Sequence, residues 1–524
     1  MINYQLPAKI GVGPWIGFAL PLSLVIASLW ASLAHGQNLD SARLLPVGGQ
    51  RGSSVTIELP GKFDKWPISF WAQPNQVQWS ASETPGKIVA NIPADATLGL
   101  HWVRLHSPES VSPLMRFLVS EYPNVLEVEP NDAFAKPQVI ETLPAQIHGV
   151  LQKSGDVDHY QTRLSKGQRL VASVEAHRVL KSPMDACLEI VDQRGNILAQ
   201  NLDALGLDPR LVFIAPADGL FSVRIYAFPE APDSTIGYAG GEKYLYRLQS
   251  LVGDVDDLAT GFQTDALAIN EPSQREMPTV VSLVENQNRY AFYGALETPK
   301  DEDVLQIETK DAGFWKITAF AESLGSPLDA VIEVIGADNK SQAKQGDSGE
   351  IKDPVLASQM KAPGVYRIAI RDLHGRFGAV FRYRLELENE FPVVLGSVAN
   401  DVIQGKADKP TEIEVTLERT HGCSQEATVA IKGLGPEYTC EPVVSKMKEE
   451  SEKKVVLKVA AVPKADGSPQ VGWSGPISIE IQTQGQAASK QVNATNTKEP
   501  QLWLKIAPYF PANRWMFELR RCRS

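Results

Sequence analysis

Two short segments of the chain are rich in side chains that carry oxygen. The first is Glu127-Val-Glu-Pro-Asn-Asp132, and the second is Ser154-Gly-Asp-Val-Asp-His-Tyr160. A hard cation such as Ca²⁺ takes about 6–8 oxygen ligands and tolerates irregular geometry. If the fold brings the two segments together, they supply the oxygens for a calcium site. The candidate side chains are those of Glu127, Glu129, Asn131, Asp132, Asp156 and Asp158.

The alternative interpretation is that these acids line a solvated turn. Neither segment has the ligand spacing of an EF-hand loop. Clustered carboxylates without a cation repel one another, which favours the metal site. The formal net charge is −11, and removal of residues 1–36, whose one charged side chain is Lys9, would make it −12. An acidic surface suits cation binding and disfavours contact with nucleic acid.

The N-terminal segment predicts export. An apolar run extends from Ile10 to Leu33, and small residues follow around Ala34, as in a cleaved secretory signal. The run is also long enough to span a bilayer, so an uncleaved membrane anchor is the alternative. We expect a protein that is secreted, periplasmic or held at the cell surface.

Four cysteines are too few for a disulfide framework. Cys423 and Cys440 fall within one β-rich region of an exported chain, so a disulfide between them is plausible, and two free thiols are the alternative. No spacing of cysteine and histidine predicts a zinc site.

The fold class expected from the sequence is all-β, with tandem β-sandwiches. Short segments such as Thr411-Glu-Ile-Glu-Val-Thr-Leu417 alternate polar and apolar residues, which is typical of strands with one buried face. The expected divisions are a signal peptide at 1–36, an immunoglobulin-like domain at 38–121, a β-sandwich at 122–251, a second β-sandwich at 252–390, a C-terminal immunoglobulin-like sandwich at 391–494 and an unassigned tail at 495–524. We call these four folded units the first domain, module 1, module 2 and the last domain.

Module 2 repeats module 1. Gly149-Val-Leu-Gln-Lys-Ser-Gly-Asp-Val-Asp158 aligns with Gly294-Ala-Leu-Glu-Thr-Pro-Lys-Asp-Glu-Asp303, and Ser182-Pro-Met-Asp-Ala-Cys-Leu-Glu-Ile190 aligns with Ser326-Pro-Leu-Asp-Ala-Val-Ile-Glu-Val334. Self-similarity at a nearly fixed offset indicates an internal repeat. The second alignment places a valine opposite Cys187, which therefore is expected to be a small buried thiol.

The acidic segment, together with Gly155-Asp-Val-Asp158, Tyr160, Gly167-Gln168 and Gly219-Leu-Phe-Ser-Val223, resembles the bacterial pre-peptidase C-terminal domain. That family implies a β-sandwich that accompanies secreted peptidases and often binds calcium. The domain order as a whole resembles large secreted proteins of planctomycete-type bacteria.

Carried over by position, the resemblance implies that the six residues named above are the calcium ligands. His159 departs from the family pattern, which has an aromatic residue directly after the acid. Module 2 keeps Asp301 and Asp303, but its preceding segment reads Asn270-Glu-Pro-Ser-Gln274. We therefore expect one structural calcium site, in module 1, and a vestige of it in module 2.

No catalytic constellation is apparent. Gly346-Asp-Ser-Gly349 matches the nucleophile motif of chymotrypsin-like proteases, but a catalytic serine needs a general base within reach, and no histidine has surroundings that indicate one. The insertion Pro229–Lys243 of module 1 is either a binding loop or merely a tolerated long loop. We expect a non-catalytic binding or envelope-structural protein whose partner is a polysaccharide, a protein or another envelope component. The rival interpretation is an accessory region of a secreted peptidase, or a peptidase with an unrecognised motif.

Overall fold

The computed structural model describes residue 39 and residues 42–507 with internal gaps. The gaps are 61–62, 64–65, 108–109, 203–206, 230–236, 254–266, 271–278, 282, 284–287, 322–325, 349–352, 362, 379–380, 464–471 and 487–488. The expected signal segment lies outside the described residues. Within them, no helix is long and apolar enough to cross a membrane.

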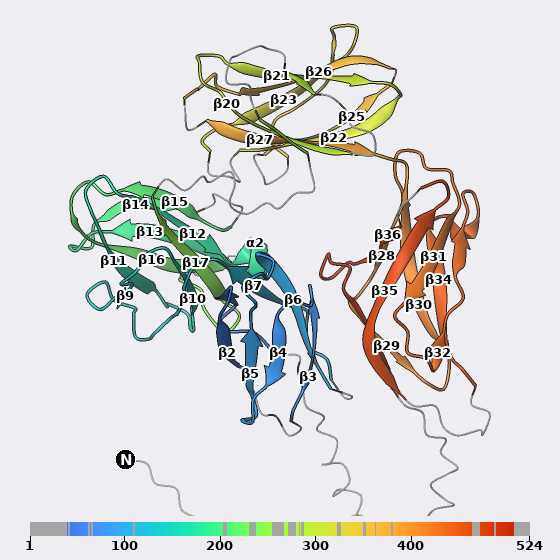
Figure 1. Cartoon of the computed structure of the whole chain (residues 1–524), viewed down its shortest axis with the longest axis horizontal. Helices are drawn as coiled ribbons and strands as arrows, with labels where there is room; N and C mark the ends of the chain where they lie inside the picture. Colours follow the sequence, from blue (N-terminus) through green and yellow to red (C-terminus); the bar gives the residue numbers. More distant parts are fainter. Residues whose placement is uncertain are drawn as a thin grey trace, which may run out of the picture.

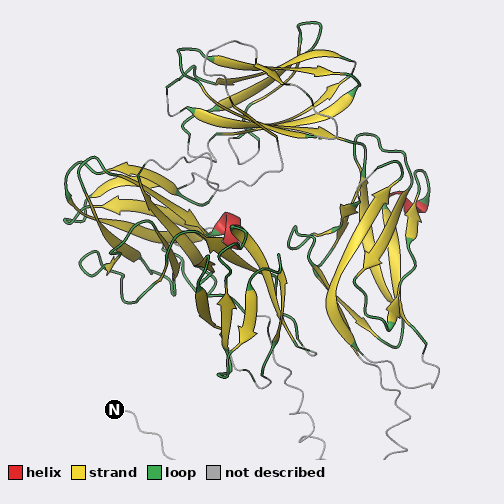
Figure 2. Ribbon diagram, in the orientation of Figure 1, coloured by secondary structure: helices red, strands yellow, loops and turns green. Residues whose placement is uncertain are grey.

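The described chain is built almost wholly of strands, which confirms the all-β prediction (Figure 2). Strands form in pairs of facing sheets, and each pair encloses its own apolar core. The alternation of polar and apolar residues along each strand explains why one face of each sheet lies on a core. Along the strand Thr411–Arg419 the side chains of Ile413, Val415 and Leu417 are buried while the intervening ones are exposed.

The first domain consists of a four-stranded sheet, ordered β1-β7-β6-β3, and a three-stranded sheet, ordered β2-β5-β4. Its strands are β1 (Gly48–Gln50), β2 (Ser54–Glu58), β3 (Ser69–Gln73), β4 (Gln78–Ala81), β5 (Lys87–Asn91), β6 (Gly99–His106) and β7 (Met115–Ser120). Its core includes Val103 and Leu105 of β6, and Phe117 of β7.

Module 1 consists of two five-stranded sheets, ordered β15-β12-β17-β10-β8 and β14-β13-β16-β11-β9. Its elements are β8 (Asn124–Leu126), β9 (Gln138–Val139), β10 (Ala145–Val150), β11 (Asp158–Leu164), β12 (Arg169–Glu175), α2 (His177–Leu180), β13 (Met184–Val191), β14 (Ile197–Asn201), β15 (Arg210–Ile214), β16 (Gly219–Pro229) and β17 (Leu245–Val252).

Module 2 repeats this topology strand for strand, with sheets ordered β18-β20-β27-β22-β25 and β19-β21-β26-β23-β24. Its strands are β18 (Leu267–Asn270), β19 (Thr279–Val281), β20 (Arg289–Ala295), β21 (Glu302–Thr309), β22 (Gly313–Phe320), β23 (Ala330–Ile335), β24 (Ser341–Gln345), β25 (Val355–Met360), β26 (Gly364–Asp372) and β27 (Arg382–Glu390). The two modules therefore share both their sequence pattern and their strand order.

The last domain pairs sheet β32-β34-β30-β28-β37 with sheet β29-β38-β35-β31-β33. Its elements are β28 (Val394–Val398), β29 (Val402–Lys406), β30 (Thr411–Arg419), β31 (Ala427–Lys432), β32 (Tyr438–Thr439), β33 (Val443–Ser445), the 3₁₀ turn η2 (Glu450–Glu452), β34 (Lys454–Ala461), β35 (Trp473–Thr483), β36 (Lys490–Gln491), β37 (Asn493–Ala494) and β38 (Leu502–Ala507). Strand β38 carries this domain beyond the expected boundary at residue 494, because Leu502, Leu504 and Ile506 complete its core.

The candidate disulfide is absent from the structure, where Cys423 and Cys440 are both free. Cys423 is buried and its thiol lies 3.2 Å from Oε1 of Gln425, whereas the Cys440 thiol lies 3.6 Å from the carbonyl oxygen of Glu441. Each thiol therefore lies close to a hydrogen-bond acceptor of a residue near it in the sequence, and not to the other thiol. Cys187 is fully buried, as the repeat predicts.

Candidate metal centre

The fold brings the two oxygen-rich segments together at one edge of module 1. Glu127 and Glu129 lie in the loop that follows β8, while Asp156 precedes β11 and Asp158 is the first residue of that strand. The strands hold the segments in place: β8 pairs in parallel with β10, so that Leu126 lies opposite His148, and β11 follows the turn after β10.

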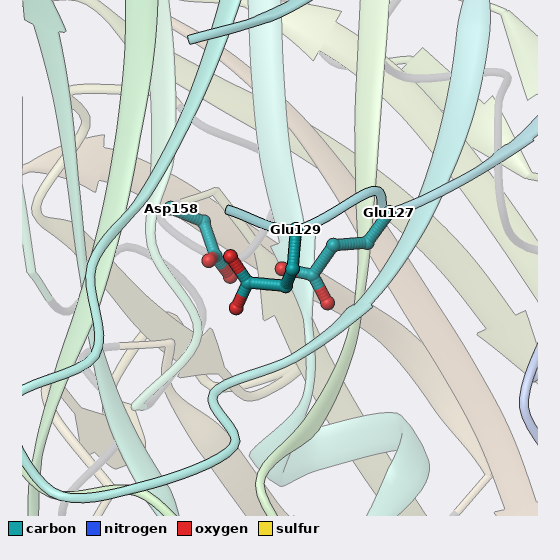
Figure 3. Close-up of side chains that lie close together, drawn as sticks. All are labelled: Glu127, Glu129 and Asp158. Carbon is teal, nitrogen blue, oxygen red and sulfur yellow. The ribbon is translucent and has the colours of Figure 1, made fainter. Parts of the chain in front are cut away.

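Carboxylate oxygens from both segments converge. Figure 3 shows Glu127, Glu129 and Asp158 pointing toward one another, the two glutamates from one loop and the aspartate from another segment. Oxygens of these three lie within 4.8 Å of one another, and so do those of Glu129, Asp132 and Asp156. Glu129 belongs to both groups. In the part of the chain that the structure describes, these are the groups of acids close enough to share an ion, and both lie in module 1.

Two of the converging carboxylates and the neighbouring Asn131 are fully buried, and each keeps an oxygen without a hydrogen-bond partner. Asn131, Asp156 and Asp158 are each 0% exposed, and when the acids are ionised no donor among the described residues reaches Oδ1 of any of them. A buried acceptor left unpaired costs about 1–3 kcal/mol, and more when it is charged. A cation between Asp156, Asp158 and the two glutamates would satisfy the two carboxylate oxygens, while the Asn131 amide nitrogen donates to Oε1 of Glu127 at 3.4 Å.

Hydrogen bonds hold the remaining oxygens of the cluster in place. Oε2 of Glu127 accepts the backbone N–H of Val150 at 2.9 Å, and Oε2 of Glu129 accepts the backbone N–H of Asn131 at 2.9 Å. Oδ2 of Asp156 accepts the backbone N–H of Gln152 at 2.5 Å. The loop therefore orients the carboxylates before any ligand binds.

Mutual repulsion and burial raise the pKa values of the acids in the protein without metal. Burial, followed by the charge of Glu127, raises the pKa of Asp158 to about 10. Burial, followed by a hydrogen bond with Asp132, raises the pKa of Asp156 to about 6. Burial also raises the pKa of Glu127. The site holds protons where a divalent cation would replace them.

The structure adds Tyr246, which the sequence reasoning missed, and places it against Tyr160 of the motif. The Tyr246 hydroxyl on β17 donates to Oδ2 of Asp158 at 2.5 Å and lies 2.5 Å from the Tyr160 hydroxyl, which also lies 3.4 Å from Glu127. Gly149 permits this arrangement, because a Cβ there would lie 2.4 Å from the Tyr246 ring. The repeat carried a signal for Tyr246: Tyr-Arg-Leu occurs at 246–248 and again at 383–385.

His159, which departs from the family pattern, lies against the acidic loop and contacts its backbone. Its Nδ1 lies 3.2 Å from the backbone carbonyl oxygen of Asn131, and the side chain is 3% exposed. It contacts the loop that presents Asn131 and is not itself among the converging oxygens. Lys153, 3.9 Å from Asp132, partly balances the exposed side of the cluster.

Module 2 keeps part of the arrangement. Tyr383 donates to Oδ2 of Asp303 at 2.6 Å, as Tyr246 does to Asp158, and Asp301 accepts the backbone N–H groups of Glu297 and Thr298. The segment that would correspond to the acidic loop, residues 271–274, lies outside the described residues. The prediction of a vestigial second site therefore stays a prediction.

Two other sequence features can be placed in part. The Ser348 hydroxyl accepts the backbone N–H of Val355 at 2.8 Å, so it stabilises a surface turn, while Gly349 lies outside the described residues. In the module 1 insertion, residues 230–236 also lie outside them, and the exposed Tyr238 packs on Tyr226 with ring centroids 4.4 Å apart.

Comparison with known proteins gives no family assignment. No family model matches the chain, and no curated protein matches it. Among solved structures, it is similar to the pre-peptidase C-terminal domain of a Bacillus anthracis collagenase (TM-score 0.17, 14% identity, 23% of this chain and 100% of that one). It is also similar to Aeromonas hydrophila PliG, a periplasmic inhibitor of g-type lysozyme (TM-score 0.18, 12% identity, 24% and 99%). A third likeness is to the Bacteroides ovatus mixed-linkage glucan utilization protein SGBP-B (TM-score 0.16, 7% identity, 68% and 76%). At these scores the likenesses carry no argument about the site, which is interpreted from its own geometry.

Proposed function

We propose that this chain is an exported, non-catalytic binding or structural protein in which calcium stabilises module 1. The observation that carries the metal proposal is the convergence of carboxylates from both segments, in which the fully buried Asp156 and Asp158 each keep an oxygen without a partner. An all-oxygen donor set that mixes carboxylates with an amide suits calcium rather than zinc, which prefers nitrogen and sulfur ligands.

The role proposed for the ion is structural. Glu127, Glu129, Asn131 and Asp132 belong to the chain that enters module 1, and Asp156 and Asp158 belong to its central turn. A bound cation would join these two segments and neutralise their repulsion. At a free calcium concentration of 100 times Kd it would stabilise the folded module by about 2.7 kcal/mol.

The calcium proposal is tested by isothermal titration of EDTA-treated protein with CaCl₂, followed by thermal melting with and without the ion. We expect saturable binding and a higher melting temperature. The paired variant Asp156→Ala with Asp158→Ala should lose both effects. If the wild-type protein shows neither heat nor a shift, the calcium proposal is refuted.

The non-catalytic proposal is tested separately, with purified full-length protein and casein or gelatin as substrates. We expect no hydrolysis above background. Hydrolysis that a single point substitution abolishes would replace the binding interpretation with that of a secreted peptidase. The partner is proposed to be a polysaccharide, a protein or another component of the cell envelope.

A further inference from the structure

The outer face of strand β6 in the first domain is buried, although it does not face that domain's core. Val103 and Leu105 point into the core, so Trp102 and Arg104, which alternate with them, point the other way. Yet Trp102 is 8% exposed and Arg104 is 1% exposed. A long cationic side chain on the outside of a sandwich is rarely so buried unless it is paired and something covers it.

The last domain has a matching feature on β38. Leu502, Leu504 and Ile506 belong to its core, while Trp503 between them points outward and is nevertheless 1% exposed. The Trp503 indole donates to Oγ of Ser474 at 2.9 Å. Its ring lies against His106 at the end of β6, with 4.9 Å between ring centroids. The outward side chain of β38 is therefore in contact with the first domain.

A charge pair crosses the same contact. The Arg104 guanidinium forms an ion pair with Asp401 of the last domain, and it also donates to the carbonyl oxygens of Ser112 at 2.8 Å and Gln501 at 3.4 Å. The other carboxylate oxygen of Asp401 accepts a hydrogen bond from Nδ2 of Asn496, with 2.7 Å between the two atoms. Both charges are thus buried with several partners, and the partners come from two domains.

A second pair lies beside the first. Arg116 of β7 lies 3.9 Å from Glu499, and its guanidinium lies 4.6 Å above the ring of Trp102. Lys181, which follows α2 of module 1, also acts electrostatically on Glu499. The positive charge of Lys181 thus lies near the same carboxylate, and Figure 1 shows α2 close to β6 and β7.

Two further contacts join neighbouring units, and module 1 is followed directly in the chain by module 2. Arg247 of module 1 donates to the carbonyl oxygen of Leu118 in the first domain at 3.5 Å. Module 2 meets the last domain where Phe314 stacks on His421, with 4.3 Å between centroids. In Figure 1 module 2 lies at the top, above the blue first domain and the orange last domain. The chain thus returns to its first domain.

We propose that the first and last domains form an intramolecular clasp that holds the four units in a closed ring, with burial of Trp503 supplying the attraction and the Arg104–Asp401 pair fixing the register. The division of roles follows from physical chemistry. A large aromatic side chain removed from water is strongly favourable. A buried ion pair roughly balances its own desolvation, but one charge left buried without its partner strongly opposes closure.

The proposal is tested on the full-length protein by hydroxyl-radical footprinting, with the oxidation of Trp503 read by mass spectrometry. Trp315 is the internal control, because it is 3% exposed but lies in the core of module 2, where opening of the clasp does not reach it. In the wild-type protein we expect Trp503 to be as protected as Trp315. Rapid oxidation of Trp503 alone would show that the ring is open and would overturn the proposal.

Single and double substitutions test the two roles. Arg104→Met should shift the closing equilibrium toward the open form by about 30-fold or more, and the oxidation rate of Trp503 should rise with it while that of Trp315 stays unchanged. Arg104→Met combined with Asp401→Asn leaves no buried charge and keeps an oxygen for Asn496, so protection should return to within a few-fold of wild type.

The matched control is Lys454→Ala, which removes an exposed ion pair with Glu414 inside the last domain and should change neither tryptophan. Small-angle scattering gives a second readout, since opening increases the radius of gyration. If the first-domain substitution impairs folding, Asp401→Asn alone tests the same pair from the other side. A single variant that leaves Trp503 fully protected, or a double variant as open as the single one, would refute the assigned roles.

Discussion

Asp158→Asn should change the stability of module 1 in opposite directions with and without calcium. Asp158 is fully buried, its Oδ1 has no donor among the described residues when the acids are ionised, and its pKa is raised from 3.8 to about 10 by burial and then by the charge of Glu127. Asparagine has the same shape and can still accept the Tyr246 hydroxyl, but it carries neither the charge nor the titrating proton.

The magnitude follows from linkage. Since the carboxyl pKa is raised on folding, the folded state keeps a proton that the unfolded state releases above about pH 4. Stability without metal therefore falls as the pH rises from about 4 toward about 10. At pH 7 the loss has accumulated over about 3 pH units at about 1.4 kcal/mol each, so its upper limit is about 4 kcal/mol. Asp158→Asn removes this loss.

The assay is differential scanning calorimetry, because module 1 contains no tryptophan to report its unfolding by fluorescence. In EDTA at pH 7 we expect the variant to melt higher than wild type, by up to about 15 °C, and at pH 4 the difference should vanish. In saturating calcium the order should reverse, since the variant has lost a charged ligand.

Asp303→Asn is the matched control, because Asp303 receives the Tyr383 hydroxyl in module 2 as Asp158 receives that of Tyr246. Its effect should not depend on calcium. If Asp158→Asn is destabilising in EDTA at pH 7, or if the two variants respond alike to calcium, the reasoning from buried, mutually repelling carboxyl groups is wrong.

Three further predictions concern single features. Burial, followed by the charge of Arg247, lowers the pKa of His148 from 6.5 to about 3. Folding stability should therefore fall as the pH drops from about 6.5 to 3. In acid titrations followed by circular dichroism, His148→Gln should flatten that dependence of stability on pH. Gly149→Ala places a Cβ 2.4 Å from the Tyr246 ring; it should destabilise module 1 by about 1–3 kcal/mol in urea unfolding and weaken calcium binding in titration calorimetry. Reductant should leave the melting temperature of the last domain unchanged, because Cys423 and Cys440 are free thiols; a drop corresponding to about 3 kcal/mol would show that they are cross-linked.

The sequence by itself determined the fold class and the repeated plan of modules 1 and 2. Both depend on local pattern: strands with one buried face alternate, as in Thr411–Arg419, and duplicated units keep their turn residues and core positions. The oxygen-rich segments could also be identified from the sequence, because the residue composition of a short segment does not depend on the fold.

Only the tertiary structure decided which oxygens converge and which are buried. The Tyr246 hydroxyl reaches Asp158 from 88 residues away, and a distance of that kind has no periodicity in the sequence. Packing also decided the state of Cys423 and Cys440, because a disulfide depends on the geometry of two side chains and not on their spacing along the chain.

The clasp shows the same limit most clearly. On pattern alone, Arg104 and Trp503 are ordinary outward residues of two strands, and β38 begins within a segment that the sequence left unassigned. Their burial arises because strands nearly four hundred residues apart, β6 and β38, face each other across a domain boundary. Alternation says which way a side chain points from its own sheet, whereas only the packing of whole domains decides whether another surface covers it.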